Sequence, residues 1–267
     1  MKTALLASFL MLASNAHANF STTILGDSRG SSVGNKDFTN NNIQNLHRKT
    51  NELVLTFDDG PTPGVTEKVL DVLKEKGVKA TFFVIASKVP AAPQIMQRML
   101  EEGHIVANHS LNHQNLTKAG MFQWKRILRQ EIIGAHDVLA PYMASQTTYF
   151  FRAPEGAWDA KNARYLNSEF DVAANYRGPV MWDIGGNVNY DKNNEIYEAA
   201  DWACWAKKMT VDECLKGYLV DTYRKKGGVV LMHDLRSHSA ELLRRYIDET
   251  TNAGYTFVNL DQVNLNK

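Results

Sequence analysis

An apolar run ends in two carboxylates and a turn at Leu53-Val54-Leu55-Thr56-Phe57-Asp58-Asp59-Gly60-Pro61. The run predicts a buried β-strand, and Gly60-Pro61 predicts a turn. Because neighbouring side chains of a strand point to opposite faces, Asp58 and Asp59 can share a site only if the chain leaves strand geometry there. Burying two carboxylates also costs free energy unless something pairs with them. The stretch is therefore either the start of a polar site or a solvated Asp-Asp-Gly turn.

Outward from this strand, strand-like and helix-like segments alternate. Further strands are predicted at 78–85, 104–108, 147–152, 170–174, 180–184, 228–232 and 255–260, and helices at 64–76, 93–102, 121–139, 195–226 with an interruption near Thr210, and 239–250. Such alternation indicates an α/β fold with a mostly parallel sheet. About seven to eight strands in one domain favour a distorted (β/α) barrel over an open sheet.

The composition narrows the class of protein. The chain has 267 residues, of which 44% are hydrophobic, enough for one large domain with a filled core. A formal net charge of +1 argues against a nucleic-acid partner, which would need a basic surface. The same balance is compatible with a neutral sugar polymer, and a monomer is expected.

The N-terminus has the three parts of a secretory signal. Lys2 supplies a positive charge, residues 3–12 are mostly apolar, and Ala16-His17-Ala18 places small residues at a cleavage site after Ala18. The apolar run is too short for a membrane span, and no later stretch is long enough. We therefore expect a signal peptide (1–18), an arm rich in Ser, Thr, Asn and Gly (19–50), a main domain (51–267), and a periplasmic or secreted location. The alternative is a buried N-terminal helix.

The chain has two cysteines, Cys204 and Cys214. In an exported protein an even pair predicts a disulfide, and two buried thiols are the alternative. Two thiols ten residues apart with no third ligand nearby do not match zinc spacing.

Reactive side chains follow four of the predicted strands. They are Asp58 with Asp59, His109 with His113, Arg152, and His233. In a parallel barrel the carboxyl ends of all strands share one face, so these side chains are expected to meet there. His109 and His113 are four residues apart, a spacing that on a helical turn places both imidazoles on one side. With Asp59 they would form a two-histidine, one-carboxylate metal site that leaves positions open for water and substrate.

Two further residues have plausible roles beside that site. The guanidinium of Arg152 can hold a carboxylate, and Asp58 is its expected partner; a surface ion pair is the alternative. His233 ends an apolar strand, and taken alone it is more often a satisfied structural histidine than a catalyst.

At this point the sequence resembles the polysaccharide deacetylases of carbohydrate esterase family 4, over roughly residues 53–260. The matching motifs are Thr56-Phe57-Asp58-Asp59-Gly60, His109-Ser110-Leu111-Asn112-His113, Arg152-Ala153-Pro154-Glu155-Gly156, Trp182-Asp183, and Leu231-Met232-His233. The first two motifs in this order are highly specific, whereas the last two alone would be weak.

The resemblance implies a role for each matched residue. Asp58 would be the general base, Arg152 its orienting partner and His233 the general acid. Asp59, His109 and His113 would bind zinc or another divalent metal such as cobalt. Substrate contacts are expected from Leu231 in an acetyl pocket, from the backbone N–H of Glu155, and from Gly156 and Trp182.

The chain departs from the family pattern at two positions. Glu155 stands where the family usually has Tyr, which adds a charge and removes a stacking surface. The family's acidic partner of the catalytic histidine lies three residues after the Trp, where this chain has Gly185; Asp183 is the possible substitute. Residues 187–205 have no counterpart in the family pattern. At least half of their aromatic residues are interpreted as core, and a substrate-binding insertion is the alternative. These aromatic residues are Tyr190, Tyr197, Trp202 and Trp205.

The expected activity is metal-dependent hydrolysis of N-acetyl groups on a hexosamine polymer. An exported chain of this kind meets peptidoglycan first, so its N-acetylglucosamine is the first expected substrate. Chitin oligosaccharide and O-acetylated xylan are the alternatives. The non-enzymatic alternative is a sugar-binding module with a decayed site.

Overall fold

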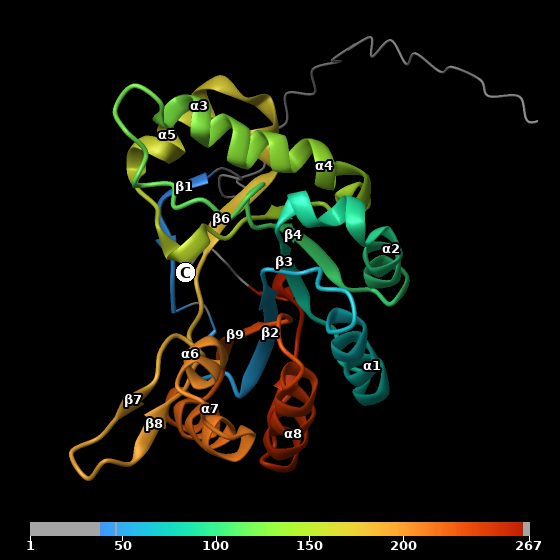
Figure 1. Cartoon of the computed structure of the whole chain (residues 1–267), viewed down its shortest axis with the longest axis vertical. Coiled ribbons are helices and arrows are strands. Elements are labelled where there is room, and N and C mark those ends of the chain that lie inside the picture. Colours follow the sequence, from blue (N-terminus) through green and yellow to red (C-terminus); the bar gives the residue numbers. More distant parts are fainter. Residues whose placement is uncertain (1–37, 46, 264–267) are drawn as a thin grey trace, which may run out of the picture. The chain divides into compact units, whose positions relative to one another are not determined.

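The computed structural model describes residues 38–45 and 47–263 (Figure 1). The predicted signal peptide, with its cleavage after Ala18, lies outside the described residues, as does most of the predicted arm. The strands are β1 (Phe38–Ile43), β2 (Glu52–Asp58), β3 (Thr81–Val84), β4 (Ile105–Asn108), β5 (Tyr149–Phe150), β6 (Tyr176–Val180), β7 (Asn189–Tyr190), β8 (Ile196–Glu198), β9 (Gly228–His233) and β10 (Thr256–Phe257). The α-helices are α1 (Thr66–Lys76), α2 (Pro93–Glu101), α3 (Trp124–Leu128), α4 (Gly134–Met143), α5 (Ala160–Glu169), α6 (Asp201–Ala206), α7 (Val211–Lys225) and α8 (Ser239–Asn252).

Strand β2, the opening stretch of the sequence, lies at the centre of the sheet. It pairs in parallel with β9 on one side and β3 on the other, and β3 pairs in parallel with β4. A second set, β1-β6-β5, is also parallel. Parallel bridges Asn108↔Phe151 and Ile184↔Val230 continue the pairing from β4 to the residue after β5 and from the segment after β6 to β9. The predicted α/β fold with a distorted, mostly parallel barrel is confirmed.

The helices cover the barrel because each has one apolar face. In α1 that face consists of Val69, Leu70, Val72 and Leu73, which belong to the same core cluster as Leu53, Leu55 and Phe57 of β2. The helix ends at Gly77, which adopts a left-handed conformation with φ 67°, as the sequence predicted for a helix stop. Helices α1, α7 and α8 lie together on the β2–β9 side of the barrel (Figure 1).

Three regions differ from the sequence-based expectation. Residues 38–43 of the predicted arm form β1, which pairs with β6; its polar sequence Phe-Thr-Asn-Asn-Asn-Ile shows no alternation. The strand expected at 170–174 is a 3-10 turn after the unpredicted helix α5, and the strand expected at 180–184 lies instead at 176–180. The segment 187–206 holds the β7–β8 hairpin, which projects beside α7 (Figure 1), and the short helix α6.

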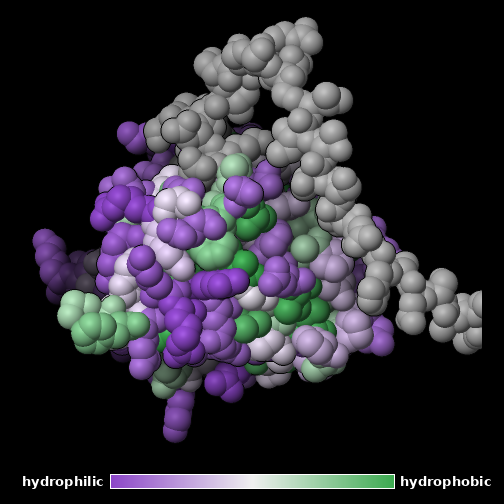
Figure 2. All heavy atoms as spheres, turned by 90° about the horizontal axis from the view of Figure 1, so that it is seen from above, coloured by the Kyte–Doolittle hydropathy of each residue, from purple (hydrophilic) through white to green (hydrophobic). Residues whose placement is uncertain are grey.

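The surface carries both polar and apolar side chains. On the face shown in Figure 2, small hydrophobic patches lie among hydrophilic side chains. Among residues 38–45 and 47–263, no helix combines the length and apolar character needed to cross a bilayer.

Candidate active site

A cavity of about 460 Å³ opens at the carboxyl ends of the barrel strands. Its lining includes the ends of β2 and β9 and the loops that follow β4 and β5. The lining residues are Asp58, Asp59, His109, His113, Ala153, Glu155, Trp182, Gly186, Trp202, Leu231, His233 and Leu235. The structure therefore brings together the reactive side chains that the sequence placed at separate strand ends, with Arg152 directly behind Asp58.

The backbone leaves strand geometry at the second carboxylate, as the opening stretch required. Asp58 is the last residue of β2, and Asp59 has a φ of 74°, a conformation that L-residues seldom adopt. Both carboxylates consequently line the same cavity. Ser110, His113 and Glu155 also have positive φ angles, of 70°, 60° and 57°. Such unfavourable backbone conformations cluster where the surrounding structure holds functional side chains in place.

The loop after β4 positions the two histidines. It is not the helical turn that the four-residue spacing suggested but an irregular turn held by side chains. The Asn108 Oδ1 atom accepts the N–H of Ser110 at 2.8 Å, and the Ser110 hydroxyl accepts the N–H of His113 at 2.9 Å. Buried Glu131 accepts the N–H of Asn112 at 2.8 Å. The ring centroids of His109 and His113 lie 5.0 Å apart as a result.

Three side chains fit a divalent metal ion. The Oδ1 atom of Asp59 lies 3.4 Å from Nε2 of His109 and 3.2 Å from Nε2 of His113, and all three candidate ligand atoms lie within 4.8 Å of one another. Asp59 Oδ1 is buried without a hydrogen-bond partner among the described residues, so a cation between the three would satisfy it.

The protonation states also suit metal binding. The Nδ1 atom of His109 lies 2.9 Å from the carbonyl oxygen of Arg152, which can only accept, so Nδ1 carries a proton and Nε2 is the nitrogen left to bind a metal. Burial lowers the pKa of His113, which favours its neutral, ligating form. Burial alone would raise the pKa of Asp59, but the adjacent imidazoles of His109 and His113 lower it to about 2.

Arg152 holds Asp58 from behind the cavity wall. Its side chain is completely buried, and Nη1 donates to Asp58 Oδ1 at 2.6 Å and to the Thr56 hydroxyl at 2.9 Å. Its Nε atom donates to the carbonyl of Val180 at 2.9 Å, so the guanidinium is fixed from three directions. The guanidinium also lies 4.1 Å from the Phe83 ring centroid. Asp58 thus keeps a fixed orientation, with its Oδ2 atom 3.6 Å from Nε2 of His109.

His233 is held by Asp201, a residue that the sequence did not single out. Oδ1 of Asp201 lies 2.8 Å from Nδ1 of His233, and Oδ2 accepts the backbone N–H of His233 at 2.6 Å. Burial would lower the pKa of His233, but the charge and hydrogen bond of Asp201, with Asp58 and Asp59 further away, raise it to about 9. The imidazole is therefore protonated at neutral pH.

The prediction that Asp183 partners His233 is wrong. The Asp183 carboxylate accepts from Arg48 Nε at 2.7 Å and from the N–H of Val229 at 3.0 Å, near the start of β9. His233 ends β9 four residues later, roughly 13 Å along the strand. No acid could occupy the family position at Gly185 either, because a Cβ there would lie 2.3 Å from the carbonyl oxygen of Leu231. The carboxylate that partners His233 belongs instead to Asp201 of α6.

The other predicted contact residues divide into two groups. Glu155, Trp182 and Leu231 line the cavity, whereas Gly156 does not and lies against the Met181 side chain. The exposed Glu155 carboxylate accepts from Asn115 Nδ2 at 2.6 Å. Sequence reasoning did not assign Ala153, Gly186, Trp202 or Leu235 to the site. Trp202 belongs to the unmatched aromatic segment for which a substrate-binding insertion was the alternative, and the structure shows it 51% exposed and lining the cavity.

A disulfide bond joins Cys204 of α6 to Cys214 of α7. Both cysteines are fully buried within the main core cluster. The short helix α6 carries Asp201 and Trp202 and so completes the site. The disulfide bond fixes this helix to α7.

Comparison with known proteins places this geometry in a family. The family model described as "Polysaccharide deacetylase" matches residues 45–172. The chain is 31% identical to the peptidoglycan-N-acetylglucosamine deacetylase PgdA of Listeria monocytogenes, over 80% of this chain and 39% of that protein. The chain thus spans well under half of that relative's length. It is 40% identical to a chitooligosaccharide deacetylase of Sinorhizobium fredii, over 67% of this chain and 70% of the relative.

Among solved structures, the Bc1960 peptidoglycan N-acetylglucosamine deacetylase superposes with a TM-score of 0.62 at 26% identity, covering 80% of this chain and 89% of that one. The chain belongs to the polysaccharide deacetylase family.

Proposed function

We propose that this protein hydrolyses N-acetyl groups on N-acetylglucosamine residues of peptidoglycan, using a divalent metal. The observation that carries the proposal is the arrangement of Asp58, held by Arg152, and His233, held by Asp201, around Asp59, His109 and His113 in one cavity. A base, an acid and a metal-ligand set are together suited to the metal-assisted hydrolysis of an unactivated amide.

Asp59, His109 and His113 would hold the metal, with zinc as the first candidate, because two imidazoles and one carboxylate leave coordination positions open. When bound, a divalent metal polarises a carbonyl and lowers the pKa of a bound water. Asp58 accepts a proton from the attacking water, and Arg152 holds the Asp58 carboxylate in a fixed orientation. The backbone N–H of Glu155 would donate to the oxyanion, and Leu231 would contact the acetyl methyl group.

His233 protonates the departing amine through Nε2, because its Nδ1 faces Asp201. An amine is a poor leaving group without that proton, whereas the alkoxide of an acetyl ester leaves more readily. The His233→Ala variant should therefore lose most activity on N-acetyl substrates and less on O-acetyl esters. Near-full amide activity in that variant would overturn the assignment of the acid.

The names of the relatives and the N-terminal sequence support the substrate. Relatives described as peptidoglycan and chitooligosaccharide deacetylases point to β-linked N-acetylhexosamine polymers. The signal-like residues 1–18 would deliver the chain to the periplasm or the exterior, where peptidoglycan is the polymer at hand.

The test is acetate release by the mature protein from purified peptidoglycan and, in parallel, from chitin oligosaccharides. Faster release from peptidoglycan supports the proposal, and faster release from chitin would replace the substrate while keeping the reaction. A sugar-binding module with a decayed site would bind both polymers and release acetate from neither.

A further inference from the structure

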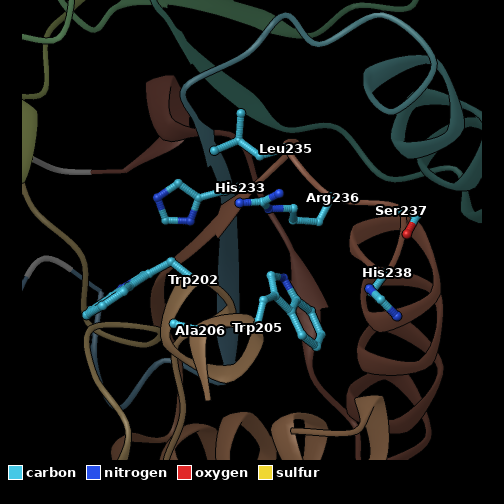
Figure 3. Close-up of a pocket in the computed structure, with 8 residues that line it drawn as sticks. All are labelled: Trp202, Trp205, Ala206, His233, Leu235, Arg236, Ser237 and His238. Carbon is cyan, nitrogen blue, oxygen red and sulfur yellow. The ribbon is translucent and has the colours of Figure 1, made fainter. Parts of the chain in front are cut away.

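A second pocket of about 520 Å³ adjoins the catalytic cavity on the far side of His233. The two share three lining residues: Trp202, His233 and Leu235. Figure 3 shows the second pocket between α6, which contributes Trp202, Trp205 and Ala206, and the loop from β9 to α8. The remaining lining residues are Arg236, Ser237 and His238. A polymer that places one unit over the catalytic cavity would therefore place a neighbouring unit here.

The α6 side of the second pocket is aromatic. Trp202 is 51% exposed, although large aromatic side chains are usually buried for their apolar area. Trp205 is partly buried, and its ring stacks on His238 with centroids 5.1 Å apart and an interplanar angle of 29°. Flat apolar faces of this kind suit the C–H face of a pyranose ring. The Trp205 ring is already fixed in orientation by its contact with His238.

The opposite side is cationic. Arg236 is exposed, and its guanidinium pairs with no carboxylate in the described part of the chain. In Figure 3 its side chain extends from the loop toward the His233 side of the pocket. No aspartate or glutamate lines this pocket, and the nearby Asp201 carboxylate is turned to His233. The catalytic cavity, in contrast, is lined by Asp58, Asp59 and Glu155.

The two adjoining pockets thus differ in the charge of their linings. We propose that the second pocket is a subsite for a carboxylate-bearing hexosamine, adjacent to the unit that is deacetylated, with Trp202 against the sugar ring and Arg236 paired with the carboxylate. A guanidinium matches a carboxylate in a two-pronged geometry that a neutral hydroxyl cannot reproduce. The inference rests on the proposed function and deepens it, because a peptidoglycan strand freed of its stem peptides alternates a neutral N-acetylhexosamine with one that bears a free lactyl carboxylate, whereas chitin has no carboxylate.

The test measures binding rather than turnover. The probes are peptide-free glycan tetramers with free lactyl carboxylates, the same tetramers with methyl-esterified carboxylates, and chitotetraose. Each is titrated calorimetrically into the Asp58→Asn variant, which keeps the subsite and lacks the base. The free acid should bind roughly tenfold more tightly than the ester, the scale of one partly exposed charged hydrogen bond. Equal affinity for acid and ester would overturn the subsite.

The Arg236→Gln substitution, in the same Asp58→Asn background, should abolish the difference between acid and ester and leave chitotetraose affinity within about twofold. The Arg126→Gln substitution is the matched control, since Arg126 is an exposed arginine on α3 that does not line this pocket. Discrimination that survives Arg236→Gln, or that Arg126→Gln also removes, contradicts the assignment. If the wild-type protein releases no acetate while the acid–ester difference holds, the proposed activity fails and the subsite stands.

Discussion

Asp201 of α6 holds His233 of β9 by two hydrogen bonds, one to the imidazole Nδ1 at 2.8 Å and one to the backbone N–H at 2.6 Å. The carboxylate therefore fixes both the ring and the strand end that carries it. With Nδ1 occupied, only Nε2 remains to face the catalytic cavity. This pair explains how His233 has a carboxylate partner although Gly185 stands at the position of the family's usual acid.

The Asp201→Asn substitution should lower activity on N-acetyl substrates by about 100-fold or more, the scale of one general acid. The pKa of His233, about 9 with Asp201 in place, should fall toward the ordinary value of 6.5. In its proposed role as the general acid, His233 must be protonated, so activity should decline as pH rises through about 9 in the wild type and at lower pH in the variant. The pH profile of kcat/KM measures this shift.

The matched control is Asp183→Asn, which removes a buried carboxylate that pairs with Arg48 and leaves His233 untouched. It should lower the Tm without moving the alkaline limb of the profile. An unshifted limb in Asp201→Asn would show that another group controls His233.

The Arg152→Lys substitution should reduce kcat by about 10- to 100-fold, because an ammonium cannot reproduce the directed contacts to Asp58, Thr56 and the Val180 carbonyl. It should also destabilise the fold by about 2 kcal/mol or more, since buried acceptors lose their donors. Kinetics and urea unfolding measure the two effects.

For comparison, Arg98→Lys alters an arginine that pairs near the surface with Asp71 and Glu102. The cost there should be within about 1 kcal/mol. Equal effects at the two arginines would contradict the orienting role of Arg152.

Replacing both Cys204 and Cys214 by alanine should lower stability by about 2–3 kcal/mol. Because α6 carries Asp201, the variant should also lose activity and show an alkaline limb shifted to lower pH. Measuring both the unfolding curve and the pH profile separates the effects. A folded double variant with an unchanged profile would mean that core packing alone positions α6.

Acid should destabilise the protein through His104. Burial lowers the pKa of His104 to about 4, and its Nδ1 accepts the N–H of Ala80 at 3.2 Å, which requires the neutral ring. The unfolded chain binds the proton near pH 6.5, so the stabilisation present above pH 6.5 is lost as pH falls toward 4, by about 3 kcal/mol. Urea unfolding at several pH values should show a flatter acid limb for His104→Gln. An unchanged acid limb in this variant would show that other groups cause the loss of stability at low pH.

Much of the fold could be predicted because its periodic signals are local. The run 53–57 is apolar at nearly every position, as expected for a strand buried on both faces, and Gly77 marks the end of α1. The strand β1 could not be predicted, because Thr39 to Asn42 are polar and become ordered only by pairing with β6. The strand 176–180 contains a Gly-Pro pair that locally signals a turn.

The site could be predicted where its residues stand next to a strand end. Asp59 and His113 each follow a predicted strand, and the structure places both in the cavity. Asp201 could not be found in this way, because it reaches His233 across 32 residues and from a helix. The steric exclusion of an acid at Gly185 depends on the carbonyl of Leu231, a contact that exists only in three dimensions.

The most direct measurement of the central claim is acetate release from purified peptidoglycan by protein whose metal content is known. The protein should carry close to one divalent ion per chain, release acetate, lose this activity with a chelator and regain it when the metal is restored. His113→Ala should retain the fold and lose both metal and activity. Acetate release that continues undiminished without bound metal would contradict the account.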